Sequence, residues 1–446
     1  MSRIILALAA SVLGVSIGCW KLDCGCDPIR DESPRNAARE ELDRKLGLLP
    51  AEGDGRWNKL RASPDEAEAN LETQIRQLEA LGYASGTKTA PSLSGVTLHD
   101  IKRANPGLNF YVSGHAAEAV LMTMDGRVVH RWARDFWDVW PGDDAERAQE
   151  GTQHWRHAQP FDNGDLLAIH EGLGLVKLDK ASDVIWARRN GAHHQFHVLP
   201  NGDIAVLARE ARLIERVDAN RPILEDFVLI LDGNGSEKER YSVLEAFERS
   251  AQYRTIWDEA TRRSGDLFHT NSIQVLDGRF SGLDPAFAQG NFLLSSRHLN
   301  TVFIVAPRRN EVIWAFRAGF EAQHDAQLLD DGRLMLFDNS GKGHVSAVEV
   351  YEPETAALLW QYSGSKTQPF YTQFCGAAQR LPNGNTLITE SDNGRAFEVT
   401  ADGAIVWEFY NPHRAGERDE FIATLFRLVR LPADFPIDWA SPPDPP

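Results

Sequence analysis

Three histidines stand at nearly the same distance before the glycine of a predicted turn. They are His194, His269 and His324, which precede Gly202, Gly278 and Gly332 by eight or nine residues. In a protein built from repeated blades, residues at one repeated position meet around the axis of the ring. A single histidine at the start of a strand is normally structural, whereas three in an equivalent position predict a shared site.

Imidazole groups gathered in this way suit the transfer of a charged group between two oxygen atoms. A neutral imidazole is a nucleophile, and it gains or loses a proton near neutral pH. Its attack on an anionic ester avoids the charge repulsion that a carboxylate would meet. The spacing therefore predicts nucleophilic or acid–base catalysis, provided that the fold brings the three positions together.

Recurrent turns and runs that end in tryptophan define the repeat that positions these residues. The turn sequences FDNGD (161–165), LPNGD (199–203), LDDGR (329–333) and LPNGN (381–385) each join two apolar runs, as in β-hairpins. The alternating element is an apolar run ending at Trp132, Trp186, Trp314, Trp360 or Trp407. The pattern recurs at roughly 35 to 50 residues, which is typical of propeller blades.

The chain is therefore predicted to be all-β, with the fold of a six-bladed β-propeller. Blades are expected to start near residues 107, 156, 194, 269, 324 and 375, and Arg156 and Gly376 occupy the histidine position in two of them. The last apolar run, 421–431, should return to the first blade, because ring closure removes exposed sheet edges. Segments 134–153 and 245–265 interrupt the pattern and are expected to be insertions, the second with helical spacing.

Composition and charge narrow the classes of function. The chain has 446 residues, of which 42% are hydrophobic and 25% charged, so it is globular rather than disordered or fibrous. Its formal net charge of −17 disfavours nucleic acid as a partner, because an acidic field repels phosphate backbones. Of the four cysteines only Cys375 lies beyond the first 26 residues, so the body has no disulfide framework.

The amino terminus has the pattern of a targeting segment. Residues 4–20 form an apolar run behind Arg3, which predicts a secretory signal or an uncleaved membrane anchor and places the body in the cell envelope, on the periplasmic side. The sequence SIGC, ending at Cys19, resembles a bacterial lipoprotein cleavage site, although Ser16 stands where Leu is usual. Cleavage, a retained anchor and a lipid on Cys19 all remain open.

Four regions are predicted along the chain. They are a signal peptide or membrane anchor (1–27), a linker with an amphipathic helix (28–104), the propeller (105–433) and a C-terminal tail (434–446). Within the second region, Ser63 has the character of an N-cap and Gly82 ends the helical pattern. The apolar face of this helix is expected to pack on the propeller.

Five motifs in series resemble those of the bacterial arylsulfotransferase family. They are HHQFHVLPNGD (193–203), DLFHTNSI (266–273), SSRHLNTVFIV (295–305), QHDAQLLDDGRLMLFDN (323–339) and GAAQRLPNGNTLITES (376–391). The resemblance covers about 105–431 in one order. It implies a six-bladed propeller that moves a sulfuryl group from an aryl sulfate donor to a phenolic acceptor. The implied mechanism is ping-pong transfer through a sulfated histidine, with no nucleotide donor (PAPS).

The resemblance also implies which residues carry the reaction. His324 of the QHDA motif would be the nucleophile, with Arg297, His269 and His194 as further catalytic residues. An arginine supplies a permanently charged, forked donor for sulfuryl oxygens. The other two imidazoles can donate to oxygen and carry the phenolic proton. Neither a cofactor nor a metal is implied.

Three more residues are expected to bind the substrate or to orient the catalytic rings. They are Asn271, His193 and Asp325, and for Asn271 and Asp325 a purely structural role is an equal alternative. Alternation along a strand should turn one member of the His193–His194 pair away from the channel. The sequence does not say which, and it leaves the natural donor, the acceptor and the oligomeric state open.

Other classes of propeller compete with this interpretation. A metal-dependent hydrolase or lyase could bind a divalent ion with the three histidines. Against it stand the nearby cation of Arg297 and the absence of a carboxylate from the same position of the repeat. A quinone-dependent dehydrogenase would need clustered carboxylates for calcium, which the blade ends lack. A non-enzymatic binding module of the envelope would have no reason to gather an arginine and three histidines.

Overall fold

The structure is a computed structural model that describes residues 88–89, 91–145, 150–340, 345–365, 367–415 and 418–440. The apolar segment 4–20 with Cys19, the predicted helix after Ser63 and the last residues of the tail lie outside the described residues. Among those that are described, no helix is long and apolar enough to cross a membrane.

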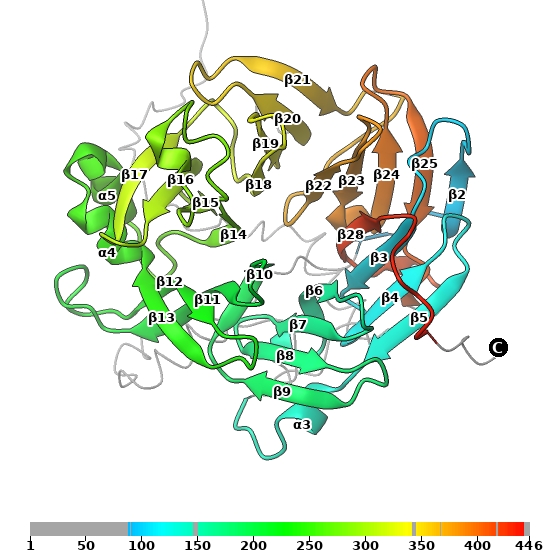
Figure 1. Cartoon of the computed structure of the whole chain (residues 1–446), viewed down its shortest axis with the longest axis horizontal. Helices are drawn as coiled ribbons and strands as arrows, with labels where there is room; N and C mark the ends of the chain where they lie inside the picture. Colours follow the sequence, from blue (N-terminus) through cyan, green and yellow to red (C-terminus); the bar gives the residue numbers. More distant parts are fainter. Residues whose placement is uncertain are drawn as a thin grey trace, which may run out of the picture.

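Six antiparallel sheets stand around a central axis, each contributing one innermost strand to the channel (Figure 1). Blade 1 contains β28 (Leu425–Leu431), β3 (Leu108–Ser113), β4 (Glu118–Met122) and β5 (Val128–Ala133). Blade 2 contains β6 (Trp155–Pro160), β7 (Leu166–His170), β8 (Gly174–Leu178) and β9 (Val184–Arg188). Blade 3 contains β10 (Ala192–Val198), β11 (Ile204–Arg212), β12 (Ile223–Leu231) and β13 (Glu237–Ser242).

The other three blades follow the same inner-to-outer order. Blade 4 contains β14 (Thr270–Val275), β15 (Phe292–Ser296), β16 (Thr301–Ala306) and β17 (Glu311–Phe316). Blade 5 contains β18 (His324–Leu328), β19 (Leu334–Asp338), β20 (Ala347–Tyr351) and β21 (Leu358–Ser363). Blade 6 contains β22 (Ala377–Arg380), β23 (Thr386–Glu390), β24 (Arg395–Val399), β25 (Ile405–Tyr410) and β2 (Gly95–His99). The predicted six-bladed β-propeller is therefore confirmed.

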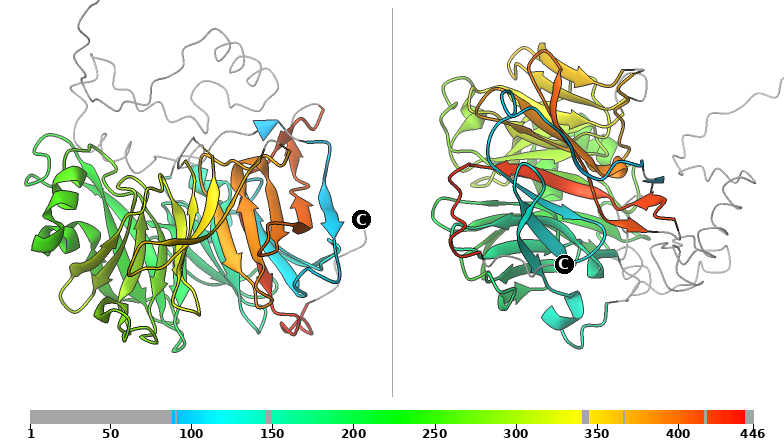
Figure 2. Two further views of the ribbon diagram at one scale, coloured as in Figure 1. Left: turned by 90° about the horizontal axis from the view of Figure 1, so that it is seen from above. Right: turned by 90° about the vertical axis from the view of Figure 1, so that its right-hand side faces the viewer.

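The two ends of the described chain both take part in closing the ring. β28 pairs with β3 in antiparallel register, with Leu428 opposite Tyr111, as predicted from the last apolar run (Figure 2). β2 pairs with β25 as a fifth, outermost strand of blade 6, which the sequence analysis had left within a linker. A small sheet of β1 (Lys88–Thr89), β27 (Phe421–Ile422) and β26 (Arg414–Ala415) lies beside this junction.

Recurrent tryptophans join four of the outer strands to the next blade. The Trp132 indole N–H donates to the carbonyl of Gly164, in the FDNGD turn of blade 2, at 2.9 Å. Trp407 of blade 6 donates to Met124 of blade 1 at 2.9 Å, which repeats the contact across the closure. A buried indole needs such an acceptor for its N–H, so the repeat of tryptophan in the sequence reflects contacts between neighbouring blades.

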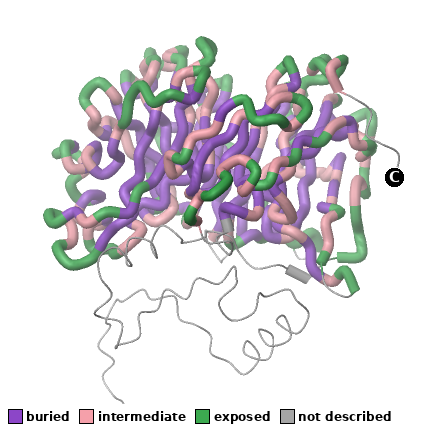
Figure 3. Tube along the Cα trace, turned by 90° about the horizontal axis from the view of Figure 1, so that it is seen from below, coloured by how far each residue is buried: buried purple, intermediate pink, exposed green. Residues whose placement is uncertain are grey.

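Apolar side chains fill the space between the sheets, and the middle strands of the blades are buried, whereas most connecting loops are exposed (Figure 3). Outside the sheets lie α3 (Phe136–Val139), α4 (Val243–Arg249), α5 (Arg254–Ala260) and short 3-10 turns η2 (Glu150–Thr152), η3 (Ala251–Tyr253), η4 (Pro285–Phe287) and η5 (Ser391–Asn393). Ser242 caps α4 by accepting from the amide of Glu245. Phe247 of this helix stacks on Phe268 at 5.4 Å, which fixes the segment that enters blade 4.

Candidate active site

Three imidazoles from three blades meet at one end of the channel. Nitrogen atoms of His194, His269 and His324 all lie within 4.8 Å of one another. The ring centroids of His194 and His269 are 5.1 Å apart, and those of His194 and His324 are 6.4 Å apart. The sequence-based prediction that these three positions converge is therefore confirmed as geometry.

Local backbone geometry directs these side chains toward one another. His194 and His269 adopt left-handed φ values of 53° and 51°, and Asp325, next to His324, has a φ of 51°. The register of each of the three inner strands shifts at this point, as in a β-bulge. Such a backbone costs about 1–3 kcal/mol at a non-glycine residue and is found where function requires a side chain to be redirected.

The tautomer of His324 follows from its partners. Its Nδ1–H donates to the carbonyl of Ala322 at 3.0 Å and to Oδ1 of Asn339 at 2.8 Å. The Asn339 amide is oriented because its Nδ2 donates to the carbonyls of Thr372 and Cys375 at 3.0 and 2.8 Å. With the proton on Nδ1, the lone pair of His324 is on Nε2, which is the arrangement that a nucleophile requires.

A carboxylate orients His269 in a similar way. Asp266 accepts from the His269 amide at 2.9 Å and from its Nδ1–H at 2.8 Å. Burial lowers the pKa of His269 to about 3, although Asp266 acts in the opposite direction. His269 is therefore neutral at pH 7, with its proton on Nδ1 and Nε2 as the acceptor nitrogen.

The adjacent histidines of β10 take different places. His194 lines the cavity with His324, and its amide donates to Oε2 of Glu171 at 3.0 Å. His193 lies behind it, with its Nδ1 2.8 Å from Nδ1 of His194 and its Nε2 3.8 Å from Oδ1 of Asp226. Burial, followed by nearby cations, lowers the pKa of both rings well below its ordinary value.

The cavity beside His194 and His324 has a volume of about 20 Å³, which is room for about one water molecule. All six blades contribute to its lining, through residues on or next to their innermost strands: Arg156, His157, His194, Gln195, Asn271, His324, Asp325, Gly376, Ala377, Phe426 and Arg427. Arg156, at the position equivalent to the histidines, lies over the Phe426 ring at 5.1 Å and has its Nε 4.0 Å from Glu171. The buried Arg156 side chain thus lines the same cavity as His194 and His324 and places a positive charge there.

Arg297 supplies a second cation beside the cluster. Its amide donates to the carbonyl of His269 at 3.2 Å, and its guanidinium lies 5.5 Å from the centre of the Phe374 ring. After burial, Arg297 contributes most to holding the pKa of His324 well below its ordinary value. An anionic substrate at the cluster would therefore meet a forked donor next to the His324 ring.

The residues predicted to orient the rings have other contacts. Asn271 lines the cavity and donates through Nδ2 to the carbonyl of Gln323 at 2.8 Å, while its buried Oδ1 has no partner among the described residues. Asp325 accepts from Arg427 of the closing strand at 2.6 Å and from the amide of Ala378 at 2.9 Å. In the described part of the chain Asp325 joins blades, and neither side chain hydrogen-bonds an imidazole.

The three clustered histidines offer nitrogen ligands in the number that a catalytic zinc ion uses. Two positively charged side chains, Arg156 and Arg297, reach the same rings and depress the pKa of His324, so they would oppose a divalent cation. The carboxylates of Glu171 and Asp266 lie next to the rings of His194 and His269. The sequence analysis, which found no carboxylate at the histidine position of the repeat, did not predict these contacts. We assign no metal to the cluster, because its cations favour an anion.

Sequence reasoning also missed several residues that hold the catalytic rings. Asp266 and Asn339 lie within the quoted motifs, but nothing local showed that they would contact His269 and His324. Arg156 was placed at the equivalent position of blade 2 from the repeat, but no role was predicted for it. Asp226 is one of two adjacent acidic residues in the otherwise apolar β12, and carboxylates inside a buried strand were the available signal.

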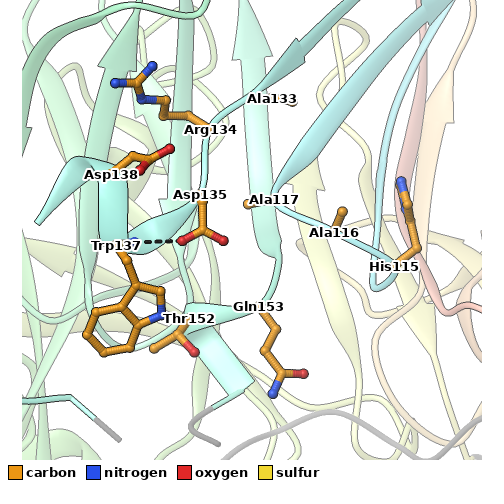
Figure 4. A pocket seen from close by; sticks show the side chains of 10 residues that line it. All are labelled: His115, Ala116, Ala117, Ala133, Arg134, Asp135, Trp137, Asp138, Thr152 and Gln153. Atoms are coloured by element: carbon orange, nitrogen blue, oxygen red, sulfur yellow. Dashed lines mark hydrogen bonds between the residues drawn. The ribbon is translucent and has the colours of Figure 1, made fainter. Parts of the chain in front are cut away.

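A larger groove of about 600 Å³ lies on the loops of blades 1 and 2 (Figure 4). It is lined by His115, Ala116, Ala117, Ala133, Arg134, Asp135, Trp137, Asp138, Thr152 and Gln153. Figure 4 shows the Asp135 carboxylate accepting from the amide of Trp137, which caps α3. None of the three clustered histidines lines this groove, so its size does not make it the reacting centre.

We expect the protein to lose stability in mild acid. Six buried histidines have a pKa lowered by burial: His157, His170, His193, His194, His269 and His324. Below the ordinary value of 6.5 the unfolded chain binds protons that the folded chain does not, so stability falls as the pH falls. Each such group costs about 1 kcal/mol near pH 5.5. Denaturant unfolding at pH 7.5 and 5.5 measures this loss, and equal stabilities would contradict it.

The family model described as Arylsulfotransferase (ASST) matches residues 157–412, which is more than half of the chain. The matched range contains the three clustered histidines, Arg297 and the residues that orient them. No curated protein matches the chain.

Several solved structures are similar to the chain at low sequence identity. A protein of unknown function from Bacteroides caccae is 12% identical, with 72% of this chain and 98% of that chain covered and a TM-score of 0.47. The β-propeller domain of Cps50 (Swd1) from Myceliophteria thermophila is 14% identical, with 78% and 100% covered and a TM-score of 0.41. Virginiamycin B lyase from Staphylococcus aureus is 10% identical, with 76% and 98% covered and a TM-score of 0.39.

Proposed function

Because the chain belongs to the arylsulfotransferase family, we propose that it moves a sulfuryl group from an aryl sulfate to a phenolic acceptor through a sulfated His324. The observation that carries the proposal is the fixed tautomer of His324. Its Nδ1–H is held by Ala322 and Asn339, so the Nε2 lone pair is the nucleophile, in a cluster flanked by cations.

In the first half-reaction, Nε2 of His324 attacks the sulfur atom and the bond from sulfur to the aryl oxygen breaks. The sulfuryl group is then bonded to nitrogen, and the phenolate departs with the electron pair of the broken bond. Arg297 and Arg156 stabilise the negative charge that spreads over the sulfuryl oxygens and the leaving oxygen. Asn339 accepts from Nδ1–H throughout and stabilises the positive charge that develops on the ring.

In the second half-reaction a phenolic acceptor occupies the place that the first phenol has left. Its oxygen attacks sulfur, the nitrogen–sulfur bond breaks, and His324 returns to its starting form. Splitting the transfer into two similar steps predicts ping-pong kinetics and no requirement for a nucleotide. The orientation of His269 by Asp266 lets its Nε2 accept a hydrogen bond from the hydroxyl while the phenol binds, before that proton is passed to the group that protonated the first phenol.

Transfer from 4-nitrophenyl sulfate to phenol tests the proposal. Release of nitrophenol should depend on the acceptor and be matched by phenyl sulfate, with parallel double-reciprocal plots. The same reaction after chelation should be undiminished. Hydrolysis at a rate independent of the acceptor, or loss of activity when one bound zinc ion per chain is removed, would indicate a metal-dependent hydrolase instead of a transferase.

Replacing Arg297 by lysine should lower turnover by about tenfold to a hundredfold. Lysine keeps the charge but loses the forked geometry that contacts two oxygens at once. The fold should survive, because lysine keeps the charge and most of the length of a side chain that lies over the Phe374 ring. Steady-state rates with saturating acceptor measure the effect. Wild-type rates in the Arg297→Lys variant would remove this arginine from the site.

We also propose that the propeller works outside the cytoplasm, tethered by residues 4–20 or by a lipid on Cys19. The support is the charged residue ahead of a long apolar run. Cell fractionation that recovers the full-length protein in the cytoplasm would contradict this location.

A further inference from the structure

A buried carboxylate and a buried imidazole stand behind His194. Asp226 lies on β12 and His193 on β10, and these side chains are 1% and 0% exposed. The proposed reaction assigns neither of them a step. Burying a carboxylate costs several kcal/mol unless it is paired or protonated. The buried position of Asp226 next to the site therefore suggests a functional role.

Asp226, His193 and His194 lie in succession, each next to the following one, and His194 lines the cavity. Oδ1 of Asp226 is 3.8 Å from Nε2 of His193, and Nδ1 of His193 is 2.8 Å from Nδ1 of His194. Oδ1 of Asp226 and Nε2 of His193 have no hydrogen-bond partner within the described ranges. Two buried polar atoms that face each other in this way need only a small rotation to reach hydrogen-bond length.

The surroundings of Asp226 favour a proton on its carboxyl group. Oδ2 accepts from the amide of Thr270 at 2.8 Å, which leaves Oδ1 as the oxygen facing His193. The charged groups near it are the Asp266 carboxylate and the Arg209 guanidinium. Burial and then Asp266 raise the pKa of Asp226 to about 7, so a large fraction of the carboxyl groups is protonated at neutral pH.

The other two rings of the cluster cannot supply a proton to a leaving phenolate. Both are neutral, and their Nδ1–H groups are directed away from the cavity, to Asp266 and to Asn339. His194 differs from them because the partner of its Nδ1 is another imidazole. A proton that enters His194 at Nδ1 can leave it at Nε2, toward the cavity.

We propose that Asp226, His193 and His194 form a proton relay that protonates the departing phenol, an inference that rests on the proposed sulfuryl transfer. The relay starts with protons on Oδ1 of Asp226, Nδ1 of His193 and Nε2 of His194. His194 gives its Nε2 proton to the phenolate oxygen. His193 passes its Nδ1 proton to Nδ1 of His194, and Asp226 passes its proton to Nε2 of His193.

After this step Asp226 is a carboxylate and both rings are neutral with exchanged tautomers. Oε1 of Glu171, 3.6 Å from Nδ1 of His194, stabilises the proton at its new position. The incoming phenol then reverses the relay, because its hydroxyl proton returns through His194 to Asp226. No proton is gained or lost over a turnover, and no further reactant is required. Asp226 and His193 act through His194, and both are therefore positioning residues.

The test varies the basicity of the leaving phenol. Phenyl sulfate releases a basic phenolate that needs the proton, whereas 4-nitrophenyl sulfate releases a weakly basic one that does not. In single-turnover experiments, Asp226→Asn should slow adduct formation from phenyl sulfate by about a hundredfold. The rate from 4-nitrophenyl sulfate should stay within about threefold of wild type, because asparagine fills the same space without a transferable proton.

His193→Gln should show the same dependence on the leaving group, and the double variant should be no slower than either single variant. Glu225→Gln is the matched control, since Glu225 is the adjacent carboxylate of β12, 2% exposed, and bonds Ser242 and Arg212 instead. Equal slowing with both donors, or no slowing with phenyl sulfate, would overturn the relay. If the wild type forms no adduct from either donor, the transferase proposal itself fails.

Discussion

Replacing His324 by alanine should abolish sulfuryl transfer. Alanine cannot form the nitrogen–sulfur bond, and no other ring of the cluster has its lone pair fixed by an asparagine in the same way. Turnover should fall by about 10⁴-fold or more, since loss of a nucleophile removes the covalent route as a whole. The burst of phenol seen with donor alone should disappear from stopped-flow traces.

The controls separate chemistry from folding. His99→Ala, on the outermost strand of blade 6, should keep the wild-type burst. His269→Ala should keep the amplitude of the burst and slow turnover with phenol, because His269 assists the acceptor and does not carry the sulfuryl group. A His324→Ala protein that keeps a full burst would show that the nucleophile is a different residue.

The largest loss of stability is expected at the ring closure. Arg430 of β28 and Glu398 of β24 form an ion pair at 3.0 Å with both side chains at most 1% exposed. Arg430 also donates to Asn109 at 2.7 Å and to the carbonyl of Asn105, so the pair joins the first blade to the last. Glu398→Ala leaves a buried guanidinium without its carboxylate, which should cost about 3–5 kcal/mol.

Denaturant unfolding of the Glu398→Ala variant measures this cost. The control is Lys238→Ala, which breaks an exposed pair with Asp203 and should leave the stability close to that of the wild type, because both charges are hydrated. If the two variants lose the same free energy of unfolding, the buried ion pair does not stabilise the closure. The pairing of β28 with β3 would then have to stabilise it.

The fold was predictable because its repeat is local. The hairpins use turn glycines, and four outer strands carry a tryptophan whose indole N–H donates to the next blade, so both signals recur within one blade of sequence. β2 has no such signal. Its residues GVTLH are half-exposed and gain strand structure only by pairing with β25, more than 300 residues later.

The site was predictable only in part, for the same physical reason. The histidine position repeats with the blade, so convergence of the rings follows from symmetry. Asn339 and Glu171, just past the ends of β19 and β7, contact those rings, and Asp226 of β12 approaches His193 behind them; no spacing in the sequence encodes such contacts. Strand alternation could not decide between His193 and His194, because the outcome depends on the left-handed backbone of His194.

The mass of the intact protein after mixing with 4-nitrophenyl sulfate alone tests the sulfated histidine most directly. The wild type should gain the mass of one SO₃ group, stable at high pH and discharged by phenol, and peptide mapping should place it on His324. The His324→Ala variant should gain nothing. A wild-type protein that transfers the sulfuryl group to phenol without ever carrying the adduct, or that carries it on another residue, would contradict the account.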